Sequence, residues 1–125
     1  MKVSRREFES LVARTAEQIV RTLPGELRER ARDVLFATDD YPPPGLESPE
    51  GEDDLLGLYE GTPLTERTLE YIPVLPDRIT LFRIPLAEMC ITDAELRKEV
   101  RTTLIHELGH YFGFDEDELE RLGYG

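Results

Sequence analysis

The strongest constraint on this chain comes from His106 and His110, the only two histidines in the sequence. Glu107 directly follows the first, so the stretch has the pattern H-E-x-x-H. Residues four apart lie one turn above each other on one face of a helix, so two imidazoles placed there can converge on one ion. The alternative is a solvated face of an acidic helix with two unrelated histidines, but random placement would rarely give this spacing together with the glutamate. The stretch therefore predicts a helix that carries a zinc site.

The motif lies near the end of a long predicted helix. Thr92 and Glu95 have the spacing of a capping box at its start, and Gly113 stands where a left-handed residue would end it. One side of this helix carries an apolar stripe of Leu96, Val100, Leu104 and Leu108. A different side carries Glu99, Thr103, His106 and His110. We therefore expect one face of the helix to pack in the core and another to hold the metal.

The rest of the chain alternates between helical and strand patterns. Ser4 and Glu7 have capping-box spacing, and the apolar residues that follow predict an amphipathic helix ending before Pro24. Shorter helices are expected over about residues 26–31 and 115–122, and strands over 33–38, 55–61 and 78–84. Residues 39–54 are rich in proline and acidic residues and are expected to form a loop, and Pro85 is expected to end the third strand. The pattern predicts an α+β fold with a small sheet.

Length and composition limit the classes of function. A chain of 125 residues is expected to form one domain, residues 1–125, whose core needs neither a disulfide nor a metal, which favours a catalytic metal over a structural one. Cys90 is the single cysteine and is expected to be buried and unreactive. The net charge of −12 argues against nucleic acid and anionic membrane as partners. Without an apolar segment of membrane-spanning length or a signal-peptide pattern, a cytoplasmic location is expected.

A catalytic zinc takes three protein ligands, so His106 and His110 require a third. A carboxylate after the Gly113 turn is the expected source, because the chain reverses there and returns past the metal about three residues later. Glu116 is the first choice, which gives H-E-x-x-H-x-x-G-x-x-E. Asp115 is an alternative with a competing role as a helix cap, and an upstream carboxylate such as Glu99 is another.

Glu107 is the expected general base. It points beside the metal, because it is rotated about 100° around the helix from His106. From there it can take a proton from a zinc-bound water and deliver it to a leaving amine, which indicates hydrolysis of an amide, most simply a peptide bond. The strand at residues 78–84 is a candidate edge for pairing with an extended peptide, or else an ordinary edge strand guarded by Arg78 and Arg83.

Three stretches carry a resemblance to a known family: residues 106–119, 56–61 and 75–79. Taken in their order along the chain, they resemble the small bacterial zincin-like metallopeptidase family, sometimes described as minimal zincins, and the similarity runs from about Leu23 onward. The resemblance implies an α+β zincin-like fold with the motif helix under a small twisted mixed sheet. It also implies zinc ligands at His106, His110 and Glu116 and a general base at Glu107. The family often has aspartate where this chain has Glu116.

The sequence therefore predicts a cytoplasmic, zinc-dependent metallopeptidase that acts on a peptide or protein substrate. One alternative is a non-catalytic module that keeps the zincin fold and acts as a protein-interaction or regulatory domain. Glu107 argues against that alternative, because binding alone requires no base. Another is zinc-dependent hydrolysis of a bond other than a peptide bond.

Overall fold

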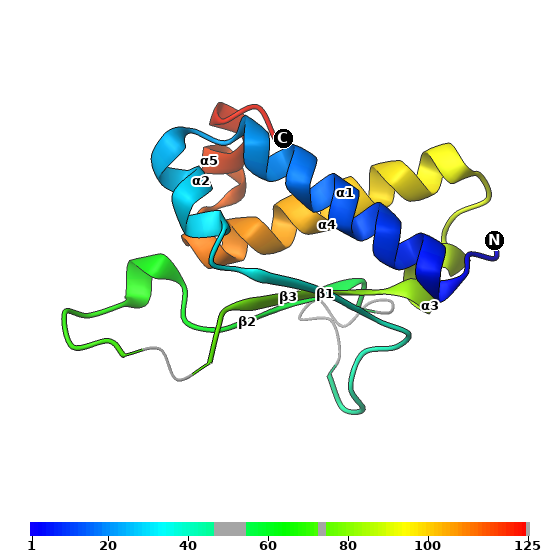
Figure 1. Ribbon diagram of the computed structural model, residues 1–125, viewed down its shortest axis with the longest axis horizontal. Helices are drawn as coiled ribbons and strands as arrows, with labels where there is room; N and C mark the ends of the chain where they lie inside the picture. The colour runs from blue at the N-terminus through cyan, green and yellow to red at the C-terminus, as the bar shows by residue number, and fades with distance from the viewer. Residues whose placement is uncertain (47–54, 73–74, 125) are drawn as a thin grey trace.

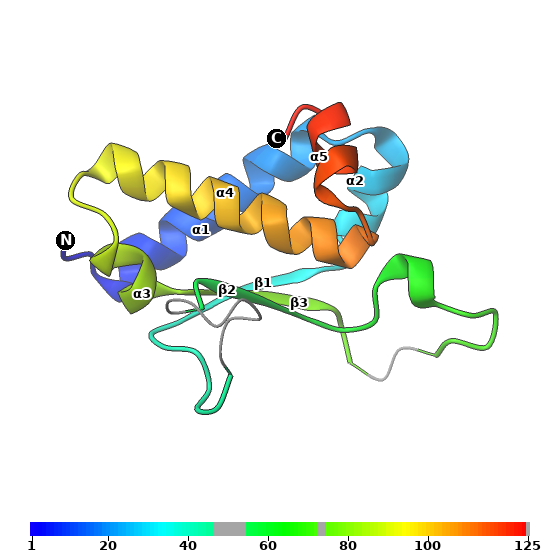
Figure 2. The ribbon, with the colours of Figure 1, turned by 180° about the vertical axis from the view of Figure 1, so that it is seen from behind.

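The computed structural model describes residues 1–46, 55–72 and 75–124. Its helices are α1 (Arg5–Thr22), α2 (Gly25–Ala31), α3 (Arg83–Glu88), α4 (Asp93–Phe112) and α5 (Glu116–Arg121). Its strands are β1 (Leu35–Asp39), β2 (Gly57–Glu60) and β3 (Arg78–Phe82), and a 3-10 helix, η1 (Leu64–Glu66), follows β2. The α+β class is confirmed, and α1 and α4 lie across the same face of the sheet (Figures 1 and 2).

The core lies between the sheet and the two long helices. Helix α1 begins at the Ser4 cap, whose hydroxyl accepts the Glu7 N–H as predicted, and α4 contributes the predicted leucine and valine stripe. Strand β3 adds Ile79 and Leu81, which are fully buried. The fully buried side chains of α1 and α4 that meet them include Phe8, Val12, Val100 and Leu104. The hydrophobic periodicity of the two helices therefore describes the packed core.

The strand order is β1-β3-β2, with β1 parallel and β2 antiparallel to β3. The expectation of an edge strand at residues 78–84 is wrong, because β3 is paired on both sides. Alternation predicts a strand but not its neighbours, and here β1 and β2 occupy the two edges. Four of the five β3 residues are buried, as a central strand under two helices requires.

The turn from β3 into α3 also differs from expectation. Pro85 does not end the strand, because the chain becomes helical at Arg83 and Pro85 lies in the first turn of α3. Proline is tolerated there, since the first turn of a helix has no partner for its backbone N–H groups. Strand β1 begins two residues later than predicted, at Leu35. Of the loop predicted at 39–54, residues 47–54 lie outside the described residues.

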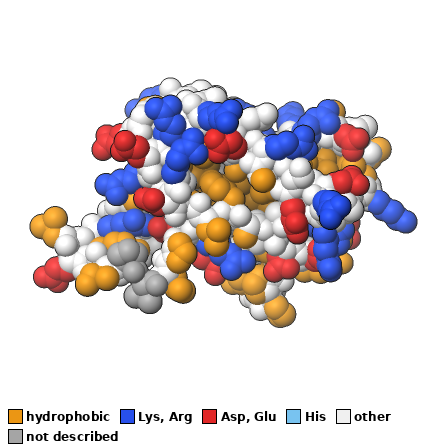
Figure 3. Space-filling view, viewed as in Figure 1, with side chains coloured by type: hydrophobic (Ala, Val, Ile, Leu, Met, Phe, Trp, Pro, Cys, Tyr) orange, Lys and Arg blue, Asp and Glu red, His pale blue; other side chains and the backbone are white. Residues whose placement is uncertain are grey.

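A hollow of about 500 Å³ lies between α1 and β1, lined by apolar side chains that include Val12, Ala16, Val34 and Phe36. Figure 3 shows hydrophobic side chains gathered on this face. Neither motif histidine lines it, so it is not the site predicted from the sequence. No helix in the described part of the chain is long and apolar enough to cross a membrane.

Candidate active site

Helix α4 carries the whole H-E-x-x-H stretch, and both of its ends form as the sequence predicts. The Thr92 hydroxyl accepts the Glu95 N–H at the first turn, 3.1 Å away. At the other end Gly113 has φ 76°, in the left-handed region that favours glycine. The Phe114 N–H then donates to the Gly109 carbonyl at 2.8 Å. These contacts fix the last turn of the helix, which contains His110.

The two histidines lie side by side on the exposed face of α4. Their ring centroids are 4.7 Å apart, with the ring planes at 55°. Both side chains are exposed, whereas Leu104 and Leu108 of the apolar stripe are buried. Two imidazoles at this separation on adjacent turns suit a single ion bound through one nitrogen of each. Thr103, which was expected on the same face, is instead buried beneath β2.

Glu107 is buried, with 7% of its surface exposed, because β2 crosses directly over it. A methyl group on Gly57 of β2 would lie 3.4 Å from the Glu107 Cγ, so the strand comes as close as a glycine allows. Burial raises the pKa of the Glu107 carboxyl. The two histidines and a hydrogen bond from the Tyr59 backbone N–H act in the opposite direction. One carboxylate oxygen of Glu107, Oε1, is 3.9 Å from His110 Nδ1, so the carboxylate lies beside the histidine pair.

The carboxylates after Gly113 form the predicted helix start. Asp115 caps α5 by accepting the Glu118 N–H at 2.8 Å, and the Glu118 side chain accepts the Asp115 N–H in return. Glu116 is exposed at the first position of α5. In the ranges 1–46, 55–72 and 75–124, no three His, Cys, Asp or Glu side chains converge as a metal site. The structure thus brings the histidines together without a third ligand, and Glu116 stays a prediction.

Comparison with known protein families gives one match. The family model described as zincin-like metallopeptidase covers residues 31–125, which run from the end of α2 to the last residue. The chain belongs to the zincin-like metallopeptidase family. A search of curated proteins gave no match. The matched region contains the sheet, α4 and the turn into α5, whereas all of α1 and all but the last residue of α2 precede it.

Two elements of this zincin-like metallopeptidase were missed from the sequence. The first is the position of β2: the strand itself was predicted, but its packing directly over Glu107 was not. The second is a partly buried ion pair between Arg67 and Asp77, with N···O 2.6 Å, next to β2. The only early signal was that Tyr59 and Asp77 belong to separate stretches that carry the family resemblance. Their contact requires the tertiary fold.

The tyrosines near the motif have packing roles. Tyr111 is buried, and its hydroxyl donates to the Arg30 carbonyl at 2.9 Å. The Tyr124 hydroxyl is 2.6 Å from that of Thr22. Both hydroxyls therefore have partners on α1 or α2. Cys90 is buried as expected, and burial raises the pKa of its thiol, so it is not a competing nucleophile.

Proposed function

We propose that this zincin-like metallopeptidase is a zinc-dependent hydrolase of peptide bonds, with Glu107 as the general base. Two imidazoles on adjacent turns of one helix, with a buried carboxylate beside them, are the observation that carries the proposal. His106 and His110 would hold the metal, and Glu116 is the proposed third ligand. A structural zinc would not require a buried carboxylate beside its ligands.

The donor set fits zinc in its chemistry. Imidazole nitrogen and carboxylate oxygen are the usual ligands of a catalytic zinc, and the two exposed rings are close enough to share one ion. Bound there, zinc supplies a Lewis acid that makes water more acidic and polarises the scissile carbonyl. The proposed third ligand, Glu116, follows the Gly113 turn on the same exposed end of α4.

Glu107 is suited to proton transfer by its surroundings. Burial under β2 raises the pKa of its carboxyl above the ordinary value, and the two histidines act in the opposite direction. It would accept a proton from the attacking water and return it to the departing amine nitrogen. Both transfers need the carboxylate held at one place, because a proton acceptor acts only within hydrogen-bond reach.

Strand β2 offers a place for an extended substrate. Phe82 N–H donates to the Leu56 carbonyl, so in the antiparallel register Leu58 and Glu60 also face β3. The intervening residues, Gly57 and Tyr59, direct their backbone groups to the outer edge, next to Glu107. A peptide laid along this edge would add a strand to the sheet and present its backbone to the site. This replaces β3, the edge predicted from the sequence.

The test compares Glu107→Gln with the wild type on a mixed peptide library in the presence of zinc. We expect Glu107→Gln to bind zinc as the wild type does and to lose about 10²- to 10⁴-fold in rate, the range of a positioned base. Glu88→Gln is the control, because it makes the same change at an exposed position on α3. A Glu107→Gln variant as active as the wild type would refute the mechanism. If zinc-loaded wild type cleaves no peptide, the non-catalytic module becomes the better proposal.

A further inference from the structure

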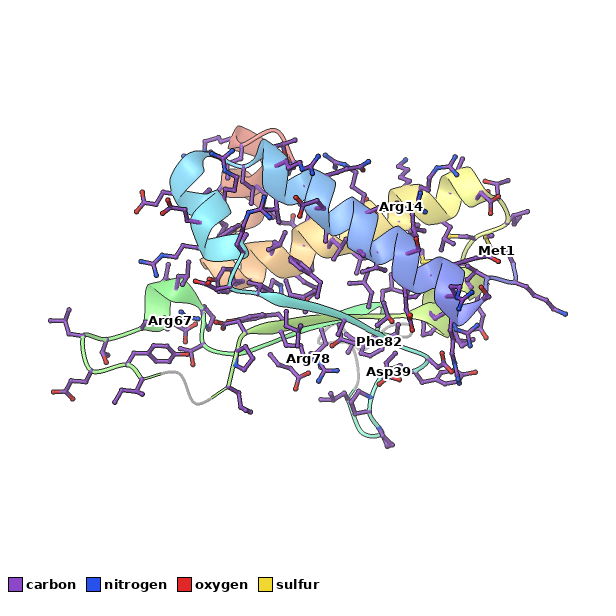
Figure 4. All side chains as sticks on the ribbon, in the orientation of Figure 1. Met1, Arg14, Asp39, Arg67, Arg78 and Phe82 are labelled. Carbon is purple, nitrogen blue, oxygen red and sulfur yellow. The ribbon has the colours of Figure 1, made fainter. Side chains whose placement is uncertain are left out.

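Asp77 is a buried carboxylate outside the motif helix. It immediately precedes β3, and only 6% of its surface is exposed. The Tyr59 hydroxyl donates to its Oδ1 at 2.7 Å, and Arg67 Nη2 donates to its Oδ2 at 2.6 Å. Both carboxylate oxygens are therefore engaged by side chains from the segment that begins with β2. Figure 4 shows Arg67 beside η1, close to the end of the sheet.

The chain is shaped to allow this contact. Gly61 has φ 149°, and a methyl group placed on it would lie 2.2 Å from Asp77 Oδ1 and 2.7 Å from the Tyr59 hydroxyl. No side chain fits there without displacing one of the two partners. A glycine at this position thus permits both the backbone conformation and the close approach of Asp77 to Tyr59.

An ion pair that is shielded from water in this way adds little to the stability of a fold. Removing two charges from water costs several kcal/mol per ion, and an apolar group of similar volume often stabilises a fold as well. What the pair does provide is a fixed geometry, because the two carboxylate oxygens and their two donors, one from Tyr59 and one from Arg67, must meet at set angles. Arg67 also lies over the Tyr71 ring at 4.6 Å and over the Tyr111 ring at 5.7 Å.

Tyr59 connects this ion pair to the proposed base. Its hydroxyl is held by Asp77, while its strand β2 lies directly over Glu107, since a methyl group on Gly57 would lie 3.4 Å from the Glu107 Cγ. Strand β2 has four residues and, within the described part of the chain, is paired with β3 on one side only. The Tyr59 ring also packs edge-on against the ring of Tyr111, the residue after His110, with centroids 5.9 Å apart. Tyr59 and its strand therefore lie against both Glu107 and the end of the motif.

We propose that Asp77, held by Arg67, is a positioning residue that fixes Tyr59 and with it the β2 backbone that supports Glu107. The inference rests on the proposed function of Glu107 as the base. It assigns Asp77 and Arg67 a role in the placement of that base, although neither touches the histidines or a substrate. Tyr59 links Asp77 to the strand, because its side chain is held by Asp77 and its backbone is part of β2.

The test removes the Tyr59 hydroxyl with Tyr59→Phe and follows backbone amide exchange in zinc-free protein by NMR. The ring and the backbone N–H remain, so only the bond to Asp77 is lost. We expect exchange of the residue 59 amide to accelerate about five- to tenfold, the value of one buried hydrogen bond, with less effect on the Leu58 amide that pairs with β3. Tyr111→Phe is the control, because it removes another tyrosyl hydrogen bond, which is directed at α2. It should leave the residue 59 amide unchanged relative to Leu58.

Activity gives a second readout on the zinc-loaded protein. We expect Tyr59→Phe to lower kcat about five- to tenfold, with KM and zinc affinity unchanged. Asp77→Asn is the second variant if Tyr59→Phe is poorly folded. It should also accelerate exchange of the residue 59 amide and lower kcat. Equal acceleration of the residue 58 and residue 59 amides, or an unchanged kcat with wild-type folding, would overturn the proposal. If the wild type hydrolyses no peptide, the proposed function fails, whereas the exchange experiment still decides whether Asp77 positions β2.

Discussion

Gly57 is the point at which the close approach of β2 to α4 can be tested most directly. A methyl group at this position would lie 2.7 Å from Thr103 Cγ2, whereas carbon atoms in contact prefer about 3.5–4.0 Å. The same methyl would lie 3.4 Å from Glu107 Cγ. Gly57→Ala therefore forces β2 and α4 apart by about 1 Å at Thr103, directly beside the proposed base.

The change in the free energy of unfolding on Gly57→Ala results from two opposed effects. Overpacking of this kind destabilises by about 1–3 kcal/mol. Alanine gains about 0.4–1 kcal/mol from the lower entropy of the unfolded chain. We expect a net loss of about 1–2 kcal/mol in the free energy of unfolding, which corresponds to roughly 4–8 °C in Tm for a chain of this length. The same shift should lower kcat more than it raises KM, because it moves the β2 backbone away from Glu107.

Thr103→Ser supplies the matched rescue, since it deletes the clashing Cγ2 and retains the hydroxyl. Alone it should cost about 1 kcal/mol for a buried methyl. Combined with Gly57→Ala, the alanine methyl occupies the vacated space, so the double variant should be no less stable than Thr103→Ser alone. Urea denaturation of all four proteins gives the coupling energy, expected at about 1–2 kcal/mol in favour of the pair. Additive effects in this cycle would refute the argument that the Thr103 methyl limits how close β2 can lie.

Two further predictions concern the metal and acid stability. Glu116→Ala should weaken zinc binding by at least about 100-fold in a chelator competition, while the neighbouring control Asp117→Ala should not; the reverse result would exclude Glu116 as a ligand. Hydrogen bonds from Arg5 and Arg83 lower the pKa of Asp40 to about 2, below its ordinary value. Its stabilising contribution is therefore present above about pH 4 and is lost as the pH falls towards 2. The stability difference between wild type and Asp40→Asn should narrow over that interval in urea titrations, and a constant difference would contradict the ion-pair assignment.

The motif helix could be predicted nearly to the residue because its signals are local. Thr92 caps the start, Gly113 adopts the left-handed conformation at the end, and the apolar stripe faces the core. Each of these depends on neighbours within one or two turns. The capping box at Asp115 is correct for the same reason.

Features that depend on distant partners could not be predicted in this way. The alternation of β3 is equally compatible with an edge and a central strand, and only pairing with β1 and β2 decides the matter. Asp77 and Arg67 each lie in a stretch rich in polar residues and proline, where a surface position is the ordinary expectation. Nothing local indicates that they meet Tyr59. The burial of Glu107 is hidden for the same reason, since it is caused by Gly57, fifty residues earlier in the chain.

The residues of α4 that pack in the core and the residues proposed for the chemistry lie on different sides of the helix. Leu104 and Leu108 face α1 and the sheet, and this packing supplies hydrophobic stabilisation. His106 and His110 lie on the exposed side, where their exchange for other residues removes little buried area. Glu107 alone belongs to both sides, because it is on the motif yet buried by β2. The environment of the proposed base is therefore governed by how closely β2 lies, and the glycines and the proposed Asp77 positioning pair act on the site without being part of the core.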